Sequence, residues 1–165
     1  MKLEQEKAQS ITKKDMMDNY NNIFNKVKHD LGNGLTYNDQ IEKYCNKTAL
    51  SKHNFLGVFA QDVNPNMIDS HDNCCLIINT SKSHEPGEHW ISIWKESNPT
   101  PKIYYFDSFG RNPEKLVPLF NGRLGGNIIY DDDKNQKDNE ENCGQRSISW
   151  LLSCCKYGIK NAIKI

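Results

Sequence analysis

One cysteine of this sequence stands where a nucleophile would be expected. Residues 139–155 read NEENCGQRSISWLLSCC, so Cys143 lies at the boundary between an acidic, polar segment and a long apolar one. The apolar segment predicts a buried helix over residues 143–157. A thiol at the first turn of a helix lies at the positive end of the helix dipole, which together with a nearby imidazolium favours the reactive thiolate. The position of Cys143 therefore predicts a nucleophile rather than a packing residue.

A histidine and an aspartate flank a predicted hairpin. The segment HWISIWKESNPTPKIYYFDSF, residues 89–109, contains two apolar strands around a turn-rich ESNPTP loop. If the hairpin is centred on Asn98, His89 lies directly opposite Asp107, with Cβ atoms about 4.5–5.5 Å apart. The carboxylate can then accept a hydrogen bond from the imidazole and orient His89 as a general base. A slip of one residue would instead move one side chain to the other face.

Donors for an oxyanion are available near the cysteine. The backbone N–H of Cys143 is a natural donor at the start of a helix, and Gly144 places no side chain where a substrate carbonyl would approach it. Gln136, seven residues earlier, can add a second donor from its side-chain amide. The residues therefore predict acyl transfer, with base, orienter and nucleophile in the chain order His89, Asp107, Cys143.

The other cysteines are expected to pack in the core. Four of the six form adjacent pairs within apolar runs, at 74–75 and 154–155, where a free cysteine behaves as a small hydrophobic residue. A zinc site is the alternative, and its potential ligands are His71, Cys74, His84 and His89. No C-x-x-C pair supports this site, and zinc would occupy the proposed base, so we expect no metal and no other cofactor.

Length and charge limit the class of protein. The chain has 165 residues, 36% of them hydrophobic, which suits one domain with a core of moderate size. Lys and Arg together number 21, as do Asp and Glu, so the formal net charge is zero. No overall basic field therefore attracts nucleic acid or a membrane surface. The N-terminal residues lack the apolar region of a signal peptide, and no apolar run could span a membrane, so we expect a soluble, intracellular protein.

The remaining pattern predicts an α+β fold, in which a small, mostly antiparallel sheet packs against helices. Apolar spacing predicts an amphipathic helix over 10–30, and Thr36 is expected to cap a short helix through 37–45. The other expected elements are strands at 75–79, 89–94, 102–109 and 127–131 and a short helix within 112–120. We expect a single domain over residues 1–165, made of a helical extension at 1–48 and a catalytic core at 50–157.

Several short motifs occur in the order found in a known family. They are His89-Trp90, YFDSFG at 105–110, Gln136 and Cys143-Gly144 heading an apolar helix, preceded by FLGVFAQD at 55–62 and CLIINT at 75–80. With this ordered set, the sequence resembles the adenovirus-type maturation protease, adenain, and its relatives the ubiquitin-like-protein proteases. The resemblance extends over residues 50–157.

The resemblance implies a viral cysteine endopeptidase that processes capsid or other virion precursor proteins. It implies His89 as general base, Asp107 as its orienter, Cys143 as nucleophile and Gln136 as oxyanion donor. Asp107 stands where the adenovirus enzymes have a glutamate and the ubiquitin-like-protein proteases an aspartate. Trp90 is implied to pack beside the catalytic pair.

The resemblance also sets expectations about partners and location. It implies a polypeptide substrate with small residues at the cleavage site, Gly at or near P1 and P2, and a location in the virion and in the host cytoplasm at the viral factory. We do not carry over the peptide and DNA activators of the adenovirus enzyme, because no cysteine is assignable to the peptide and the net charge is zero. The Asn-, Lys- and Ile-rich composition suggests the AT-rich genome of a Mavirus-like virophage or a polinton-like virus. Helices within 1–48 are expected to replace packing that such relatives obtain beyond the catalytic helix.

Other functions remain open on the same residues. A ubiquitin-like-protein protease would keep the site and change the substrate. An acetyltransferase family with the same His, Asp and Cys order passes its acyl group to Ser or Lys, and would need a basic pocket for coenzyme A or inositol phosphate. A non-enzymatic capsid or scaffold protein would not need the intact residues. The acidic segment at 131–142 is either a solvated loop or a wall of the cleft that favours basic substrate segments.

Overall fold

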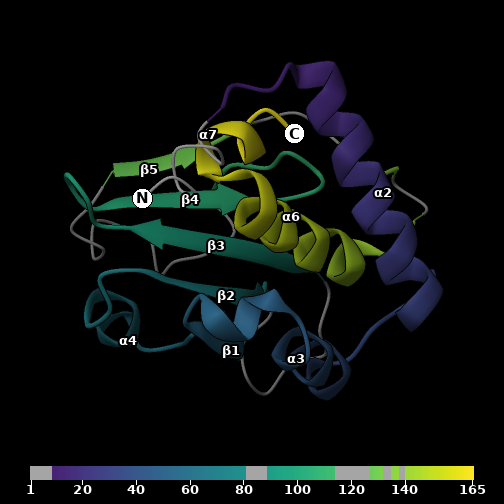
Figure 1. Cartoon of the computed structure of the whole chain (residues 1–165). Helices are drawn as coiled ribbons and strands as arrows, with labels where there is room; N and C mark the ends of the chain where they lie inside the picture. Colours follow the sequence, from purple (N-terminus) through teal and green to yellow (C-terminus); the bar gives the residue numbers. More distant parts are fainter. Residues whose placement is uncertain (1–8, 81–88, 114–126, 132–134, 138–139) are drawn as a thin grey trace.

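The computed structural model describes residues 9–80, 89–113, 127–131, 135–137 and 140–165 (Figure 1). Its helices are α2 (Lys13–Leu31), α3 (Asn38–Asn46), the 3-10 helix η1 (Ala49–Lys52), α4 (Pro65–Asp69), α6 (Cys143–Tyr157) and α7 (Ile159–Ala162). Among the residues described, no helix has both the length and the apolarity that crossing a membrane requires.

Five strands form one mixed sheet. They are β1 (Phe55–Ala60), β2 (Cys74–Asn79), β3 (Trp90–Glu96), β4 (Lys102–Phe106) and β5 (Asn127–Tyr130), in the order β1-β2-β3-β4-β5. The two central pairs are antiparallel and the two outer pairs parallel. The α+β class is confirmed, but the sheet is evenly mixed rather than mostly antiparallel. The outer strands can pair in parallel because long connections separate them from their neighbours.

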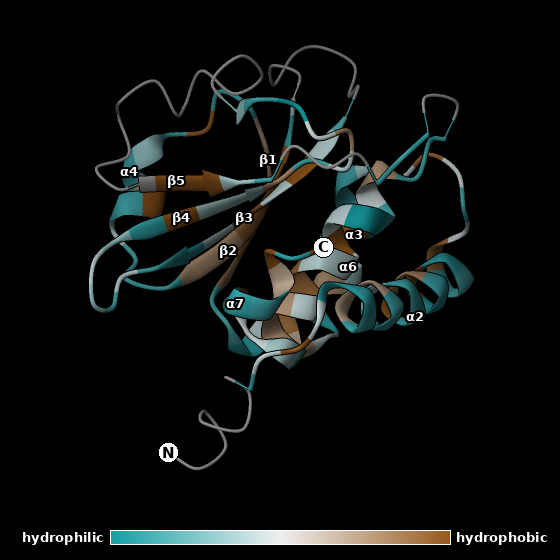
Figure 2. Ribbon diagram, turned by 90° about the horizontal axis from the view of Figure 1, so that it is seen from above, coloured by the Kyte–Doolittle hydropathy of each residue, from teal (hydrophilic) through white to brown (hydrophobic). Residues whose placement is uncertain are grey.

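Helices cover both faces of the sheet (Figure 2). The buried strand side chains facing α2, α3, α6 and α7 are those of Cys75, Ile77, Trp90, Trp94, Tyr104 and Phe106. Those packed with Ile68 of α4 are Cys74, Leu76, Ile78, Ile91, Ile93, Ile103 and Tyr105. This division follows from the two-residue period of side chains along a strand. Figure 2 shows the outer surface of α2 as hydrophilic, so α2 forms the outermost layer over α6.

Capping residues and glycines set the ends of the two long helices. Helix α2 is capped by Thr12, whose side chain accepts a hydrogen bond from the Asp15 N–H, and ends at Gly32 with φ 82°. Helix α6 begins at Cys143, as predicted, and ends before Gly158, which also has φ 82°. Glycine adopts this left-handed region without a steric penalty. The predicted span 143–157 for this helix is therefore confirmed.

The start of α3 differs from the prediction. The N-cap is Tyr37 rather than Thr36, and the Tyr37 N–H donates to Oε1 of Gln40 at 3.1 Å. Thr36 is instead buried, at 7% exposure. The helix starts one residue later because Gln40 reaches back to satisfy the backbone, which removes the need for a hydroxyl at position 36.

Two other expectations concern the strands and loops. Strand β1 was not predicted as a strand, because FLGVFA contains a glycine and lacks strict alternation. The helix expected within 112–120 lies mostly outside the described residues, as does much of the acidic segment 131–142.

The β3–β4 hairpin has a different register from the predicted one. Ile93 pairs with Tyr105, so the pairing is shifted by two residues relative to a centre at Asn98. The pairing extends to Glu96 and Lys102, whose opposite charges favour this register. The prediction that His89 lies directly opposite Asp107 was therefore wrong.

A shift of two residues nevertheless keeps His89 and Asp107 on the same face of the sheet. Because side chains alternate with a period of two, His89 and Asp107 keep the same parity and become diagonal rather than direct neighbours. Diagonal residues of an antiparallel pair are about 7–8 Å apart at Cα, within reach of an imidazole and a carboxylate.

A buried serine joins α6 to the sheet. Ser147 is fully buried, and its hydroxyl donates to the carbonyl of Trp90 at the start of β3, at 3.1 Å. Ser153, one turn and a half further along, is equally buried but donates to the carbonyl of Ser149 in its own helix, at 2.8 Å. Of these two serines, Ser147 is the one whose hydroxyl bonds to the strand.

We expect Ser147→Ala to destabilise the protein by about 1–3 kcal/mol, because it removes a buried hydrogen bond between two elements. Ser153→Ala is the matched control and should cost about 0.5 kcal/mol or less, since the Ser149 carbonyl retains its helical hydrogen bond. Thermal and urea unfolding would measure both. Equal losses for the two variants would contradict a special role for the helix–strand bond.

Candidate active site

His89 and Asp107 form a buried pair at the ends of the central strands. His89 Nε2 lies 2.6 Å from Asp107 Oδ1. The two side chains are 4% and 1% exposed, so water competes little for the hydrogen bond. The predicted pairing of these two residues is present, although the register that was expected to produce it is not.

Asp107 has two further donors, neither of which was predicted. The backbone N–H of Phe109 donates to Oδ1 at 2.8 Å, and Nε of Arg111 donates to Oδ2 at 3.3 Å. The Phe109 ring also lies against the imidazole of His89, with centroids 4.7 Å apart. The carboxylate is therefore held by donors at both oxygens, which leaves it one orientation toward the histidine.

Cys143 occupies the first position of α6 and meets the other side of the same imidazole. Its thiol lies close enough to the His89 ring to raise the pKa of the imidazole through hydrogen bonding and charge. Because Nε2 is engaged by Asp107, Nδ1 is the nitrogen left to face the thiol. The Cys143 N–H belongs to the first turn of the helix, where backbone donors lack partners within the helix. The structure thus brings together the three residues predicted for the triad.

The environment of His89 favours its protonated form. Burial by itself would lower the pKa of His89, but hydrogen bonds and charge interactions with Asp107 and Cys143 outweigh burial and raise it. An imidazole with a raised pKa accepts and holds a proton from the thiol more readily.

Gln136 is fixed by a buried network of hydrogen bonds. It is 2% exposed, and its Oε1 accepts a hydrogen bond from the Ser108 hydroxyl at 2.5 Å. Its Nε2 donates to the carbonyl of Glu140 at 2.5 Å. The amide nitrogen carries two hydrogens, so one is left that can donate to an oxyanion. Ser108 was not predicted, because nothing in its spacing distinguishes it from an ordinary strand-end serine.

Gly144 faces the interior of the protein. A Cβ at this position would clash with Oγ1 of Thr36 and would lie 3.1 Å from Cδ1 of Ile41 and 3.2 Å from Cδ1 of Trp90. Packing against Thr36, Ile41 and Trp90 thus gives a reason for this glycine, and the expected room for a substrate carbonyl stays a prediction. Trp90 is buried beside the first turn of α6, as the resemblance implied.

The alternative zinc site is not assembled by the described residues. They contain no group of three or more His, Cys, Asp and Glu side chains placed to hold a metal ion. His89 is engaged by Asp107, and Nδ1 of His71 lies 2.8 Å from the carbonyl of Met67. His84 lies outside the described residues.

The remaining cysteines pack in the interior, as expected. All are free thiols and buried. Burial raises the pKa of Cys45 to about 12 and of Cys74 to about 11, and it also raises the pKa of Cys75 and Cys154. These thiols are therefore poor nucleophiles near neutral pH.

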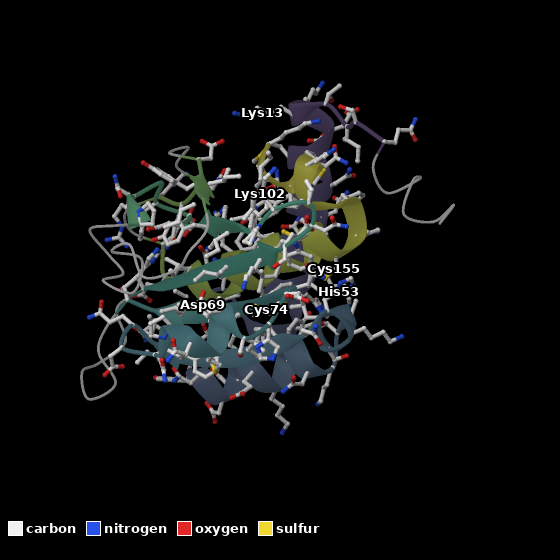
Figure 3. The ribbon with its side chains drawn as sticks, turned by 90° about the vertical axis from the view of Figure 1, so that its left-hand side faces the viewer. Lys13, His53, Asp69, Cys74, Lys102 and Cys155 are labelled. Atoms are coloured by element: carbon white, nitrogen blue, oxygen red, sulfur yellow. The ribbon has the colours of Figure 1, made fainter. Side chains whose placement is uncertain are left out.

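A large cavity lies away from the triad. It measures about 760 Å³ and lies between α2, α3, η1 and the C-terminal half of α6. A second cavity shares His53 and Cys155 with it, and Figure 3 looks onto this side of the molecule, where His53, Cys74 and Cys155 lie close together. The chemistry of the triad makes it the stronger candidate for the active site, despite the larger cavity elsewhere.

Comparisons with known proteins point to one family. The family model described as adenovirus endoprotease matches residues 55–158. A protein of Acanthamoeba polyphaga mimivirus that is named a thiol protease is 34% identical over 46% of this chain and 28% of its own length. The proteases of Porcine adenovirus A serotype 3 and Bovine adenovirus B serotype 3 are each 33% identical, over 40% and 44% of this chain. The matches cover 31% and 34% of those two proteases, so this chain spans about a third or less of these relatives.

We expect Asp107→Asn to lower the pKa of His89. The variant removes the negative charge and an acceptor that oppose the effect of burial, so the desolvated ring should favour its neutral form more strongly. A nitrogen-detected NMR titration, with the His89 signal assigned from a His89→Gln variant, would measure the shift. An unchanged or higher pKa would contradict the assignment of Asp107 as the orienting carboxylate.

We expect Gly144→Ala to destabilise the protein by about 1–3 kcal/mol, the usual cost of overpacking. Gly34→Ala is the control, because a Cβ there meets nothing within 4 Å. Adding Thr36→Ala to Gly144→Ala should restore part of the lost stability, since it removes the closest atom. Unfolding curves that show no loss for Gly144→Ala would place its Cβ in open space rather than against α3.

Proposed function

The chain belongs to the adenovirus endoprotease family, and from this membership and the geometry of the site we propose that it is a cysteine endopeptidase. The observation that carries the proposal is the line of contacts from Asp107 through His89 to Cys143. It combines a 2.6 Å buried hydrogen bond with a thiol at the first position of a helix.

In the proposed reaction, His89 takes the proton of the Cys143 thiol, and the thiolate sulfur attacks the scissile carbonyl carbon. The oxyanion of the tetrahedral intermediate accepts hydrogen bonds from the Cys143 N–H and the Gln136 amide. Protonated His89 gives its proton to the leaving amine, and the C–N bond breaks to leave an acyl-enzyme. Water, deprotonated by His89, then releases the acid and regenerates the thiol. Asp107 holds the ring oriented throughout.

The substrate is proposed to be a polypeptide of the virus itself. Proteases of two adenoviruses and a giant virus are among the proteins to which the chain is similar, which supports the cleavage of capsid or other virion precursors, in the virion and the host cytoplasm. The proposed cleavage sites contain small residues, with Gly at or near P1 and P2. The proposed source is a virus with an AT-rich genome, of the virophage or polinton-like type.

We expect Cys143→Ala to abolish peptide cleavage. The test incubates the purified protein with a library of peptides from a digested proteome and maps new termini by mass spectrometry. Loss of the nucleophile should lower cleavage by at least about a thousandfold. Cys155→Ala, which removes a buried thiol elsewhere on the same helix, should cleave the same sites as the unsubstituted protein. Equal cleavage by Cys143→Ala would remove this residue from the mechanism.

A further inference from the structure

A buried cation lies in an electrostatically unfavourable place beside the nucleophile. Arg146 is in the first turn of α6, three residues after Cys143, and is 9% exposed. The positive end of a helix dipole favours anions, so a cation there needs compensation. A buried guanidinium also needs partners for its donors. The contacts of Arg146 must therefore compensate for its positive charge and its burial.

The guanidinium donates to two side chains and stacks on one ring. Nε donates to Oδ1 of Asn142 at 2.9 Å, and Nη2 donates to Oε2 of Glu140 at 2.8 Å. The guanidinium carbon lies 4.3 Å from the centre of the Phe24 ring on α2, a cation–π distance. Arg146 thus touches the loop before α6 and the N-terminal helix at the same time.

Glu140 connects Arg146 to Gln136, the proposed oxyanion donor. Its carboxylate binds Arg146, and its backbone carbonyl accepts the hydrogen bond from Nε2 of Gln136. Burial would raise the pKa of Glu140, but the hydrogen bond and charge of Arg146 lower it overall, so the carboxylate stays charged. One residue therefore links the buried cation to the side chain proposed to bind the oxyanion.

The residues that directly follow α2 support the same end of α6. Nδ2 of Asn142 donates to Oδ1 of Asn33 at 2.9 Å. Nε2 of Gln145 donates to the carbonyls of Gly32 and Gly34, at 2.7 and 2.8 Å. The first turn of α6 is thus held by α2 and the residues after it, which lie outside the span matched by the family.

We propose that Arg146 is a positioning residue that couples α2 to the oxyanion donor, by holding Glu140 and through it the amide of Gln136. The inference rests on the proposed function, because an oxyanion donor matters only to acyl transfer. The residue does not touch the triad pair, so it acts on the stabilisation of the tetrahedral intermediate and not on the formation of the thiolate.

The expected signature is a loss in kcat with little change in binding. Loss of an oxyanion donor costs about 100- to 1000-fold in kcat, and a loosened donor should cost less, about 10- to 100-fold. The KM should stay within about threefold, since the donor acts mainly in the transition state.

The experiment compares Arg146→Met, Arg146→Lys and Glu140→Gln with the unsubstituted protein on a peptide that the latter cleaves in the library test. Arg146→Lys keeps the charge but not the planar fork, so it should recover part of the activity. Glu140→Gln keeps the backbone carbonyl and tests the ion pair if Arg146→Met proves unstable. The double variant Arg146→Met with Glu140→Gln should have a kcat no lower than that of the slower single variant, because both substitutions remove the same ion pair between Arg146 and Glu140.

Two controls separate positioning from general damage. Lys28→Met removes the other cation stacked on Phe24, also 4.3 Å from the ring centre, without touching Glu140, and should leave kcat unchanged. Alkylation of Cys143 by iodoacetamide needs the thiolate but no oxyanion donor, so its rate should change less than about twofold in the Arg146 and Glu140 variants.

Each outcome decides the proposal. A fall in kcat with an unchanged alkylation rate and KM supports it. An unchanged kcat in Arg146→Met and Glu140→Gln overturns it while leaving the protease intact. Equal losses in kcat and in alkylation rate overturn it in favour of a structural role. If the unsubstituted protein cleaves no peptide, the proposed function fails and the inference fails with it.

Discussion

The catalytic geometry depends on the packing of the N-terminus of α6 against the β3–β4 hairpin. Cys143 comes from the helix, whereas His89 and Asp107 come from the two strands, so their contact exists only while helix and sheet keep their relative position. A helix advances 1.5 Å and turns 100° per residue, so a slide of one residue would carry the thiol away from the imidazole. The buried face of α6 and the hydrogen bond from Ser147 to Trp90 prevent such a slide.

Asp107 and Ser108, the two residues that follow β4, each hold one side chain of the proposed site. Asp107 accepts from His89, and Ser108 donates to Gln136 while its carbonyl accepts the Gln136 backbone N–H. The residues proposed as general base and as oxyanion donor are therefore both held by the same short segment of backbone. Both side chains are buried, and buried hydrogen bonds of this kind have few alternative arrangements. The site is consequently oriented before a substrate arrives, which is what electrostatic stabilisation of a transition state requires.

The N-terminal helices do more than cover apolar surface. Helix α2 presents Phe24 to Arg146, and the residues after α2 accept hydrogen bonds from Asn142, at the N-cap of α6, and from Gln145, in its first turn. The expectation that residues 1–48 replace packing is consistent with the buried residues of α2, but the polar contacts also reach Asn142, in the segment that contains the proposed oxyanion donor. A segment outside the family match thereby becomes part of the support of the site.

The chemistry of the site could be inferred from residue types and order, whereas its geometry could not. Cys143 at a polar-to-apolar boundary and a His and Asp flanking two strands are local patterns, and the helix at 143–157 followed from apolar spacing alone. The predicted register of the hairpin was wrong by two residues. Register depends on how the loop closes and on cross-strand pairs, and the sequence of one strand alone determines neither. The roles of Gly144, Ser108 and Arg146 come from contacts between segments far apart in the chain. Only tertiary packing decides which atoms such residues meet, since their own neighbours in sequence impose no preference.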